Sequence, residues 1–116
     1  MPHLIIEHNQ TVNKNLNISR LTKSLHQILA KQESIKLESI KSRSIVIDDC
    51  LIGDSETKPD FIHVTLKLLA GRSDELKNSI GQSLQEEIFN EFQKAKRSRT
   101  TASITLEIRD LETYFK

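Results

Sequence analysis

The feature that most constrains the fold is a strand–helix–strand pattern that occurs twice along the chain. In residues 61–68 the even positions are aliphatic and the odd ones mostly polar, and residues 103–109 alternate in the same way. A period of two is typical of a strand with one buried face. The apolar residues between these runs recur every fourth position and are Leu76, Ile80, Leu84, Ile88 and Phe92. That spacing predicts a long amphipathic helix.

The first half of the chain shows the same order with a shorter helix. Residues 3–8 form a β-favouring run, which a polar segment up to Asn17 follows. Apolar residues at helical spacing then predict a helix from about residue 18 to 30, with Asn17 as its N-cap. Residues 44–48 are the next β-rich run, and a loop extends from there to Asp60. Each half therefore reads as one βαβ unit.

We expect one domain over residues 1–116, built from a βαβ unit in 1–52 and another in 60–116. Strands joined by a helical crossover run parallel. The expected fold class is α+β, with a four-stranded mixed sheet and two helices on one of its faces. The other face would carry Ile5, Val46 and several Thr and Ser residues. Because such a face and its two edges would be exposed, we expect a closed cyclic oligomer.

Composition limits the classes of partner. Charged residues make up 28% of the 116 residues and nearly balance, giving a formal charge of +1. This balance argues against a nucleic-acid or membrane-surface binder, which would need a basic excess. No apolar run approaches the ~18 residues of a membrane span, and the start lacks the basic region of a signal peptide. We therefore expect a cytoplasmic location.

Pro2 is the first candidate for chemistry. It follows the initiator methionine directly, and because proline is small we expect Met1 to be removed. A secondary amine would then stand at the head of the first strand. Such an amine can act as a general base near neutral pH if its surroundings lower its pKa. The alternative is that Pro2 is an N-terminal residue without a chemical role.

Other reactive side chains show weaker patterns. The four histidines have no metal-ligand spacing, so no metal site is predicted. His63 lies on the polar side of its strand, where it could line a site or face an oligomer axis, and we favour the structural role. We expect His26, on the first helix, to be solvated. Cys50 has no second cysteine for a disulfide and no evident base, so we favour an inert thiol.

Several stretches resemble one known family. They are Pro2-His3-Leu4-Ile5-Ile6-Glu7, Ile40-Lys41-Ser42-Arg43, Phe61-Ile62-His63-Val64-Thr65-Leu66-Lys67, Ala70-Gly71-Arg72-Ser73 and Phe115-Lys116. The tandem βαβ pattern with proline at the start is similar to the tautomerase superfamily, and these stretches resemble one family within it, the 5-carboxymethyl-2-hydroxymuconate isomerases. They span the whole chain, and the segment from the third strand to the second helix is the most specific.

The resemblance implies a homotrimeric isomerase that uses no cofactor. In this family the amino-terminal proline moves a proton between carbons of an unsaturated dicarbonyl acid, while arginines hold its carboxylates and polarise its keto group. Carried over by position, the proline is Pro2, and the arginine of the glycine–arginine–serine turn is Arg72. The arginine pair before the second strand corresponds to Lys41 and Arg43.

Two functions remain open. One is an isomerase of small carboxylate substrates that uses Pro2, and the other is a trimeric binding protein whose site is degraded at Lys41. Lys41 departs from the family's arginine and offers a compact charge without a bidentate fork. Arg72 stands just before Ser73, the expected N-cap of the long helix, where free backbone N–H groups favour anions. Gly71 allows the tight turn that this position needs.

Overall fold

The computed structural model describes residues 2–14, 16–54, 59–95 and 101–116. Its strands are β1 (His3–Asn9), β2 (Lys41–Ile47), β3 (Phe61–Leu69) and β4 (Ser103–Leu111). Its helices are α1 (Gln10–Asn13), α2 (Ile18–Ala30), the 3-10 helix η1 (Leu37–Ser39) and α3 (Asp74–Lys94). None of these helices is long and apolar enough to cross a membrane.

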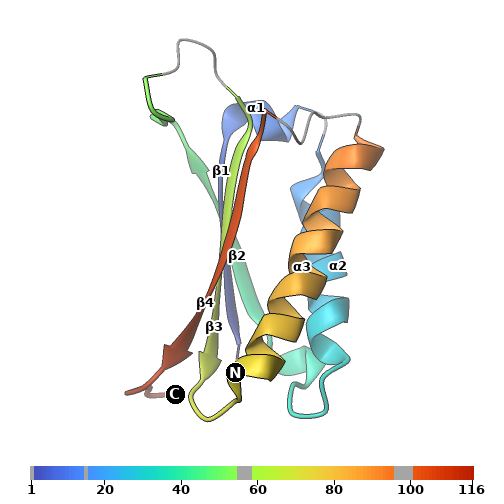
Figure 1. Ribbon diagram of the computed structural model, residues 1–116, viewed down its shortest axis with the longest axis vertical. Helices are drawn as coiled ribbons and strands as arrows, with labels where there is room; N and C mark the ends of the chain where they lie inside the picture. Colours follow the sequence, from blue (N-terminus) through green and yellow to red (C-terminus); the bar gives the residue numbers. More distant parts are fainter. Residues whose placement is uncertain (1, 15, 55–58, 96–100) are drawn as a thin grey trace.

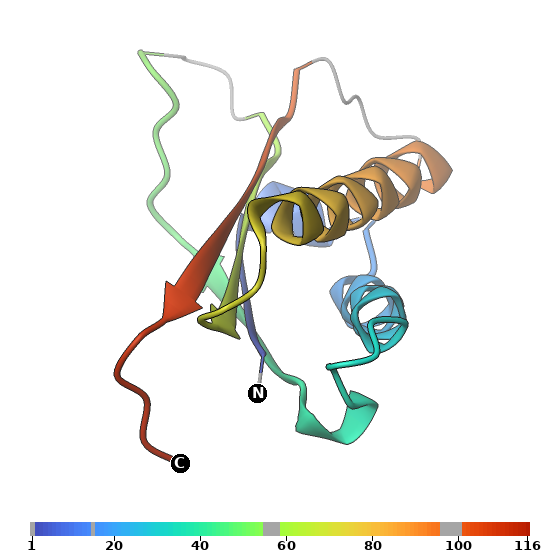
Figure 2. The ribbon, with the colours of Figure 1, turned by 60° about the horizontal axis from the view of Figure 1, so that its bottom comes forward.

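The four strands form one mixed sheet in the order β2-β1-β3-β4. β1 and β2 are parallel, β3 and β4 are parallel, and the two central strands, β1 and β3, are antiparallel. The long helices α2 and α3 both cover one face of this sheet, and none of the helices in the described residues lies on the other face (Figures 1 and 2). The expected α+β fold, with two helices on one face of a mixed sheet, is confirmed.

The core lies between the sheet and the two long helices. Its central residues are fully buried and are Leu4, Ile6, Val64, Leu66, Leu25, Leu29, Leu84, Ile88 and Phe92. The strand residues among them hold even positions, so the period of two in the sequence identified the helix-covered face. Both predicted N-caps are confirmed: Asn17 Oδ1 accepts from the Arg20 amide at 3.0 Å, and Ser73 Oγ accepts from the Leu76 amide at 3.2 Å.

Two local predictions differ from the structure. The segment after β1 contains the short helix α1, which the sequence did not predict; its single apolar residue, Val12, is fully buried. β2 begins at Lys41, three positions before the predicted start at Ser44, because Lys41 already pairs with His3 of β1. The removal of Met1 is a prediction that lies outside the described residues.

The prediction that Val46 faces away from the helices was wrong. Val46 lies opposite His8, a buried residue of the helix-covered face, whereas Ile45 lies opposite Glu7 on the other face. Register sets this assignment, because a shift of one residue turns every side chain to the opposite face. β2 is an edge strand, and the helices leave it largely uncovered, with Ile45 48% and Val46 45% exposed.

Candidate functional site

Pro2 is buried at the head of β1 and held by strand pairing. Its carbonyl accepts a hydrogen bond from the Lys41 amide at 3.0 Å. The next residue, His3, lies opposite Lys41 on β2 and opposite Lys67 on β3. The start of β1, the end of β3 and the start of α3 all lie at one end of the molecule (Figure 1). Pro2 therefore has a fixed position in the middle of the sheet at this end.

Three cations surround His3 on the sheet face without helices, and we call Lys41, Arg43 and Lys67 the cation cluster. Arg43 Nη1 lies 3.2 Å from His3 Nδ1, and Lys41 and Lys67 flank His3 in register. Burial, followed by the positive charges of the cluster, lowers the pKa of His3 from its usual value near 6.5. Within the described part of the chain, neither lysine of the cluster has an ion-pair partner. The site is thus prepared to attract an anion.

Arg72 lies in the turn between β3 and α3, at the same end of the molecule. Gly71 before it has φ of 117°, a conformation that favours glycine. Arg72 Nη1 donates to the Leu69 carbonyl at 3.2 Å, and Nη2 donates to Ser34 Oγ at 3.0 Å. Its Nε atom is buried and has no hydrogen-bond partner among the described residues.

The structure brings together some predicted site residues more closely than others. Lys41 pairs with Pro2 through the backbone, and Arg43 reaches the side chain of the residue after Pro2. Arg72 shares their end of the fold, but its contacts are with Ser34 and Leu69. Among the described residues, no hydrogen bond joins Arg72 to the other three.

Sequence reasoning missed three residues of this region. His3 and Lys67 both hold odd positions in their strands, which was the available signal, but only the register shows that they lie side by side. Tyr114 follows β4 in the carboxyl-terminal tail, and its hydroxyl lies 2.7 Å from His3 Nε2. The sequence pattern gave no indication of this contact between residues at opposite ends of the chain.

A second cluster of polar side chains lies further along the sheet face without helices, which we call the open face. His63 Nδ1 lies 2.7 Å from Thr105 Oγ1, and His63 Nε2 lies 2.8 Å from Glu107 Oε1. Glu107 also accepts from Arg109 Nε at 2.8 Å. The hydrogen bonds from Arg109 and His63 lower the pKa of Glu107 to about 2. Both ring nitrogens of His63 therefore have partners inside the chain.

The expectation that His26 is solvated was wrong. His26 is half-buried on α2, and its Nε2 lies 2.9 Å from Ser42 Oγ of β2. Burial lowers the pKa of His26 from its usual value. The described residues contain no group of three or more His, Cys, Asp or Glu side chains that could hold a metal ion.

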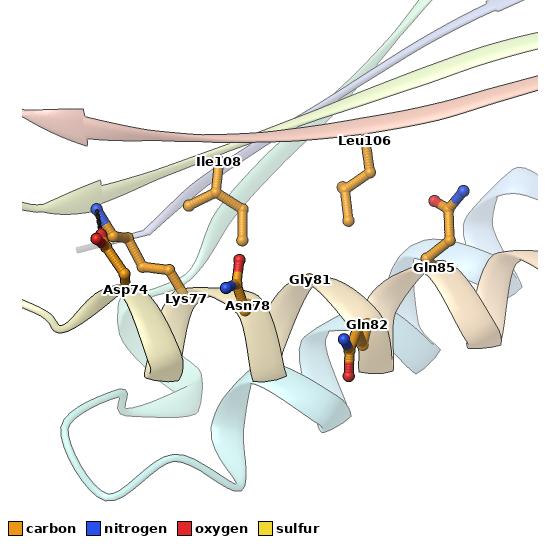
Figure 3. A pocket seen from close by; sticks show the side chains of 8 residues that line it. All are labelled: Asp74, Lys77, Asn78, Gly81, Gln82, Gln85, Leu106 and Ile108. Carbon is orange, nitrogen blue, oxygen red and sulfur yellow. Dashed lines mark ion pairs between the residues drawn. The ribbon is translucent and has the colours of Figure 1, made fainter.

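A groove of about 670 Å³ lies elsewhere, between α3 and the edge strand β4 (Figure 3). Its lining residues are Asp74, Lys77, Asn78, Gly81, Gln82, Gln85, Leu106 and Ile108. Leu106 and Ile108 point from β4 toward α3, and a Cβ at Gly81 would stand 3.3 Å from Ile108 Cδ1. None of Pro2, Lys41, Arg43 and Arg72 lines this groove.

Comparison with known proteins identifies the family to which this sequence is similar. The model of the family described as 5-carboxymethyl-2-hydroxymuconate isomerase matches residues 2–116. A 5-carboxymethyl-2-hydroxymuconate Delta-isomerase of Escherichia coli is 31% identical over 111 residues, which cover 96% of this chain and 87% of that protein.

Solved structures share this fold. The crystal structure of a 5-carboxymethyl-2-hydroxymuconate isomerase from Deinococcus radiodurans R1 aligns with a TM-score of 0.84 and 25% identity, covering 99% of this chain and 88% of the other. A structure described as a fused 4-OT wild type symmetric trimer aligns with a TM-score of 0.71 and 16% identity, covering 95% and 87%. The sheet with its proline at the head of β1 and the match over residues 2–116 agree, and this chain belongs to the 5-carboxymethyl-2-hydroxymuconate isomerase family of the tautomerase superfamily.

Proposed function

We propose that this protein is a cofactor-independent isomerase that moves a proton within an unsaturated 2-hydroxy dicarboxylic or tricarboxylic acid such as 5-carboxymethyl-2-hydroxymuconate. The general base is the secondary amine of Pro2 after removal of Met1. The observation that carries this proposal is the position of Pro2, buried between two strands and next to the cation cluster. Membership of the isomerase family supports the reaction class.

The proposed chemistry needs only protons to move. Pro2 accepts a proton from one end of the dienol, and the electron pair spreads over the conjugated system as a dienolate. The protonated amine then returns the proton to a different carbon, so no oxidant or reductant takes part. The cation cluster favours the neutral amine before the transfer and stabilises the dienolate after it.

Arg72 is proposed to bind a carboxylate or the keto oxygen of the substrate. The turn that carries it lies at the end of the molecule where β1 begins, and a guanidinium group donates strong hydrogen bonds to carboxylates. The turn also stands directly before the first free N–H groups of α3, whose dipole favours negative charge. Lys41 and Arg43, which lie on β2, would hold a second carboxylate of the substrate.

The test compares preparations that differ only at the amino terminus. Protein shown by intact mass to lack Met1 should isomerise the substrate, with activity rising along one ascending limb as the amine deprotonates. Protein that retains Met1 should be inactive, because an amide nitrogen has no basic lone pair. Pro2→Ala keeps a primary amine and should retain reduced activity. Full activity in Met1-retaining protein would exclude Pro2 as the base.

We further propose that the protein is a homotrimer whose helix-free sheet faces surround a common axis. Half-exposed Ile45, which lies on this face, would gain cover from a neighbouring subunit. The fused 4-OT structures described as trimers support this arrangement. Native mass spectrometry should give three chains, whereas a stable monomer at micromolar concentration would contradict the proposal.

An alternative function is a trimeric binding protein without activity. The observation that favours it is Lys41, which stands where the resemblance implies arginine. Such a protein would bind unsaturated dicarboxylates with the affinity of an enzyme but would show no proton exchange between carbons. Deuterium incorporation into bound substrate separates the two functions, because only the isomerase produces it.

A further inference from the structure

Tyr114 occupies a position in the candidate site that its place near the end of the chain does not suggest. We propose that the Tyr114 phenol donates a hydrogen bond to the oxygen of the substrate that becomes negatively charged, and that His3 is the positioning residue that holds this phenol. The inference rests on the proposed function, because it assigns a further hydrogen-bond donor to the same reaction. The ligand class is a 2-oxo or 2-hydroxy dicarboxylate.

The direction of each hydrogen bond follows from the chemistry of Arg43. A guanidinium group can only donate, so His3 Nδ1, 3.2 Å from Arg43 Nη1, must act as the acceptor. An imidazole that accepts at Nδ1 is neutral and carries its proton on Nε2. Nε2 therefore donates to the Tyr114 hydroxyl oxygen at 2.7 Å. Burial and the cation cluster favour this neutral form of His3.

This arrangement leaves the hydroxyl hydrogen of Tyr114 without a partner. The phenol oxygen accepts from His3, and no other hydrogen bond of Tyr114 occurs among the described residues. A hydroxyl that accepts a hydrogen bond is polarised and becomes a better donor. The chain from Arg43 through His3 to Tyr114 thus produces a strengthened O–H donor that is free to bind a ligand.

The geometry also fixes where this donor lies. The rings of His3 and Tyr114 pack edge to face, with centroids 5.5 Å apart and an angle of 74°. This contact holds the half-buried phenol beside the residue that follows Pro2. Both ribbon views show the carboxyl-terminal tail at the end of the molecule where β1 begins (Figures 1 and 2).

The charges around Tyr114 indicate an anionic ligand. Lys41 and Lys67 flank His3 and lack ion-pair partners in the part of the chain that the structure describes. They can bind a carboxylate, but a lysine ammonium gives little directional control. A neutral phenol held in one orientation supplies the directed donor that a developing oxyanion needs.

The kinetic test uses Tyr114→Phe, which keeps the ring and its packing and removes only the hydroxyl. Loss of one preorganised oxyanion donor should lower kcat by about 100-fold or more, with a much smaller change in KM. His3→Leu should lower kcat similarly, and adding Tyr114→Phe to it should have little further effect. His3→Gln, whose amide can still donate to the phenol, should retain more activity than His3→Leu. Thr113→Ala is the matched control in the exposed tail and should leave kcat unchanged.

Spectroscopy provides a test without turnover, because Tyr114 is the sole tyrosine and the chain has no tryptophan. The saturated probe 2-oxoadipate should change the tyrosine fluorescence of the protein, and also of the Met1-retaining form, in which the Pro2 amine is blocked. Nitrogen-15 spectra should show His3 protonated on Nε2 alone at neutral pH.

The outcomes separate this inference from the proposed function. If Met1-free protein is active and Tyr114→Phe keeps kcat within about twofold, the proposed function stands and the role of Tyr114 is overturned. A protein inactive on every unsaturated 2-hydroxy dicarboxylate overturns both. Unchanged tyrosine fluorescence with saturating 2-oxoadipate, or a His3 protonated on Nδ1, also overturns the inference. A large loss of kcat in Tyr114→Phe with normal folding supports it.

Discussion

The two strand–helix–strand units share a topology but differ in what their edge strands do. β4, in the second unit, directs Leu106 and Ile108 toward α3 and packs against that helix. β2, in the first unit, presents Ser42 and Ser44 at the corresponding positions of the helix-covered face. The edge strand of the second unit therefore contributes apolar packing against a helix, whereas the edge strand of the first unit has serines at the corresponding positions.

Charges on the open face differ in the same way. The edge strand β4 of the second unit has its charges paired, since Glu107 binds both His63 and Arg109. The first unit leaves Lys41 without an ion-pair partner among the described residues and directs Arg43 at His3. A strand that contributes little to the core can keep unpaired cations beside Pro2. Apolar packing and unpaired cations are thus divided between the edge strands β4 and β2.

The largest expected effect tests the packing side of this division. Phe92 of α3 is fully buried, and Phe92→Ala should lower the free energy of unfolding by about 3–5 kcal/mol. Val46→Ala on half-exposed β2 is the matched control and should cost less than about 1 kcal/mol. Urea unfolding at one fixed protein concentration measures both values. A comparable cost for Val46→Ala would show that a neighbouring subunit buries β2.

The second prediction concerns Arg72, which connects the units through Ser34. Arg72→Ala should lower kcat/KM, and the loss should correspond to about 2–5 kcal/mol of transition-state stabilisation, because a charge-assisted partner of the substrate is lost. Ser34→Ala removes one hydrogen bond of the guanidinium but keeps its charge, and should cost about 1 kcal/mol or less. Steady-state kinetics on folded protein, checked by circular dichroism, measure both. Equal effects of the two substitutions would reduce Arg72 to a structural role.

The third prediction compares arginines on the two edge strands. Arg43→Ala should lower kcat/KM by about 1.5–3 kcal/mol, the usual range for hydrogen bonds to charged groups. Arg109→Ala should leave kcat/KM nearly unchanged and instead raise the pKa of Glu107 from about 2, because its main hydrogen-bond donor is lost. Kinetics and carboxyl titration by nuclear magnetic resonance test the pair. A kinetic loss in Arg109→Ala would show that the edge strand β4 also contributes charge to the site.

The smallest expected effect is a difference in acid sensitivity between the units. The pKa of His3 is lowered in the folded protein. Its contribution to stability is therefore complete above about pH 6.5 and is lost as the pH falls through the pKa of the folded state. The pKa of Glu107 is lowered to about 2, so its contribution is complete above 4.5 and is lost only as pH falls toward 2. Residue-resolved titration should show His3 changing before Glu107. The reverse order would contradict the placement of His3 among cations and the pairing of Glu107 with Arg109 and His63.

Much of the fold followed from local patterns. Asn17 and Ser73 were identified as N-caps because their side chains can accept from the first amides of a helix, and both do. The helix-covered face of β3 followed from its alternation. The face of Val46 did not, because β2 is exposed on both sides and a short apolar run without alternation carries no information about register.

The sequence by itself determined the order of elements, the buried face of the central strands and the identity of the candidate residues Pro2, Lys41, Arg43 and Arg72. The order of elements and the buried face depend on local periodicity, and the candidate residues were carried over from short motifs that resemble those of a known family. Only the tertiary structure decided that Lys67 flanks His3 and that Tyr114 reaches it across 111 positions of sequence. The physical reason is that register and tail placement arise from long-range pairing and packing, for which the sequence has no local period.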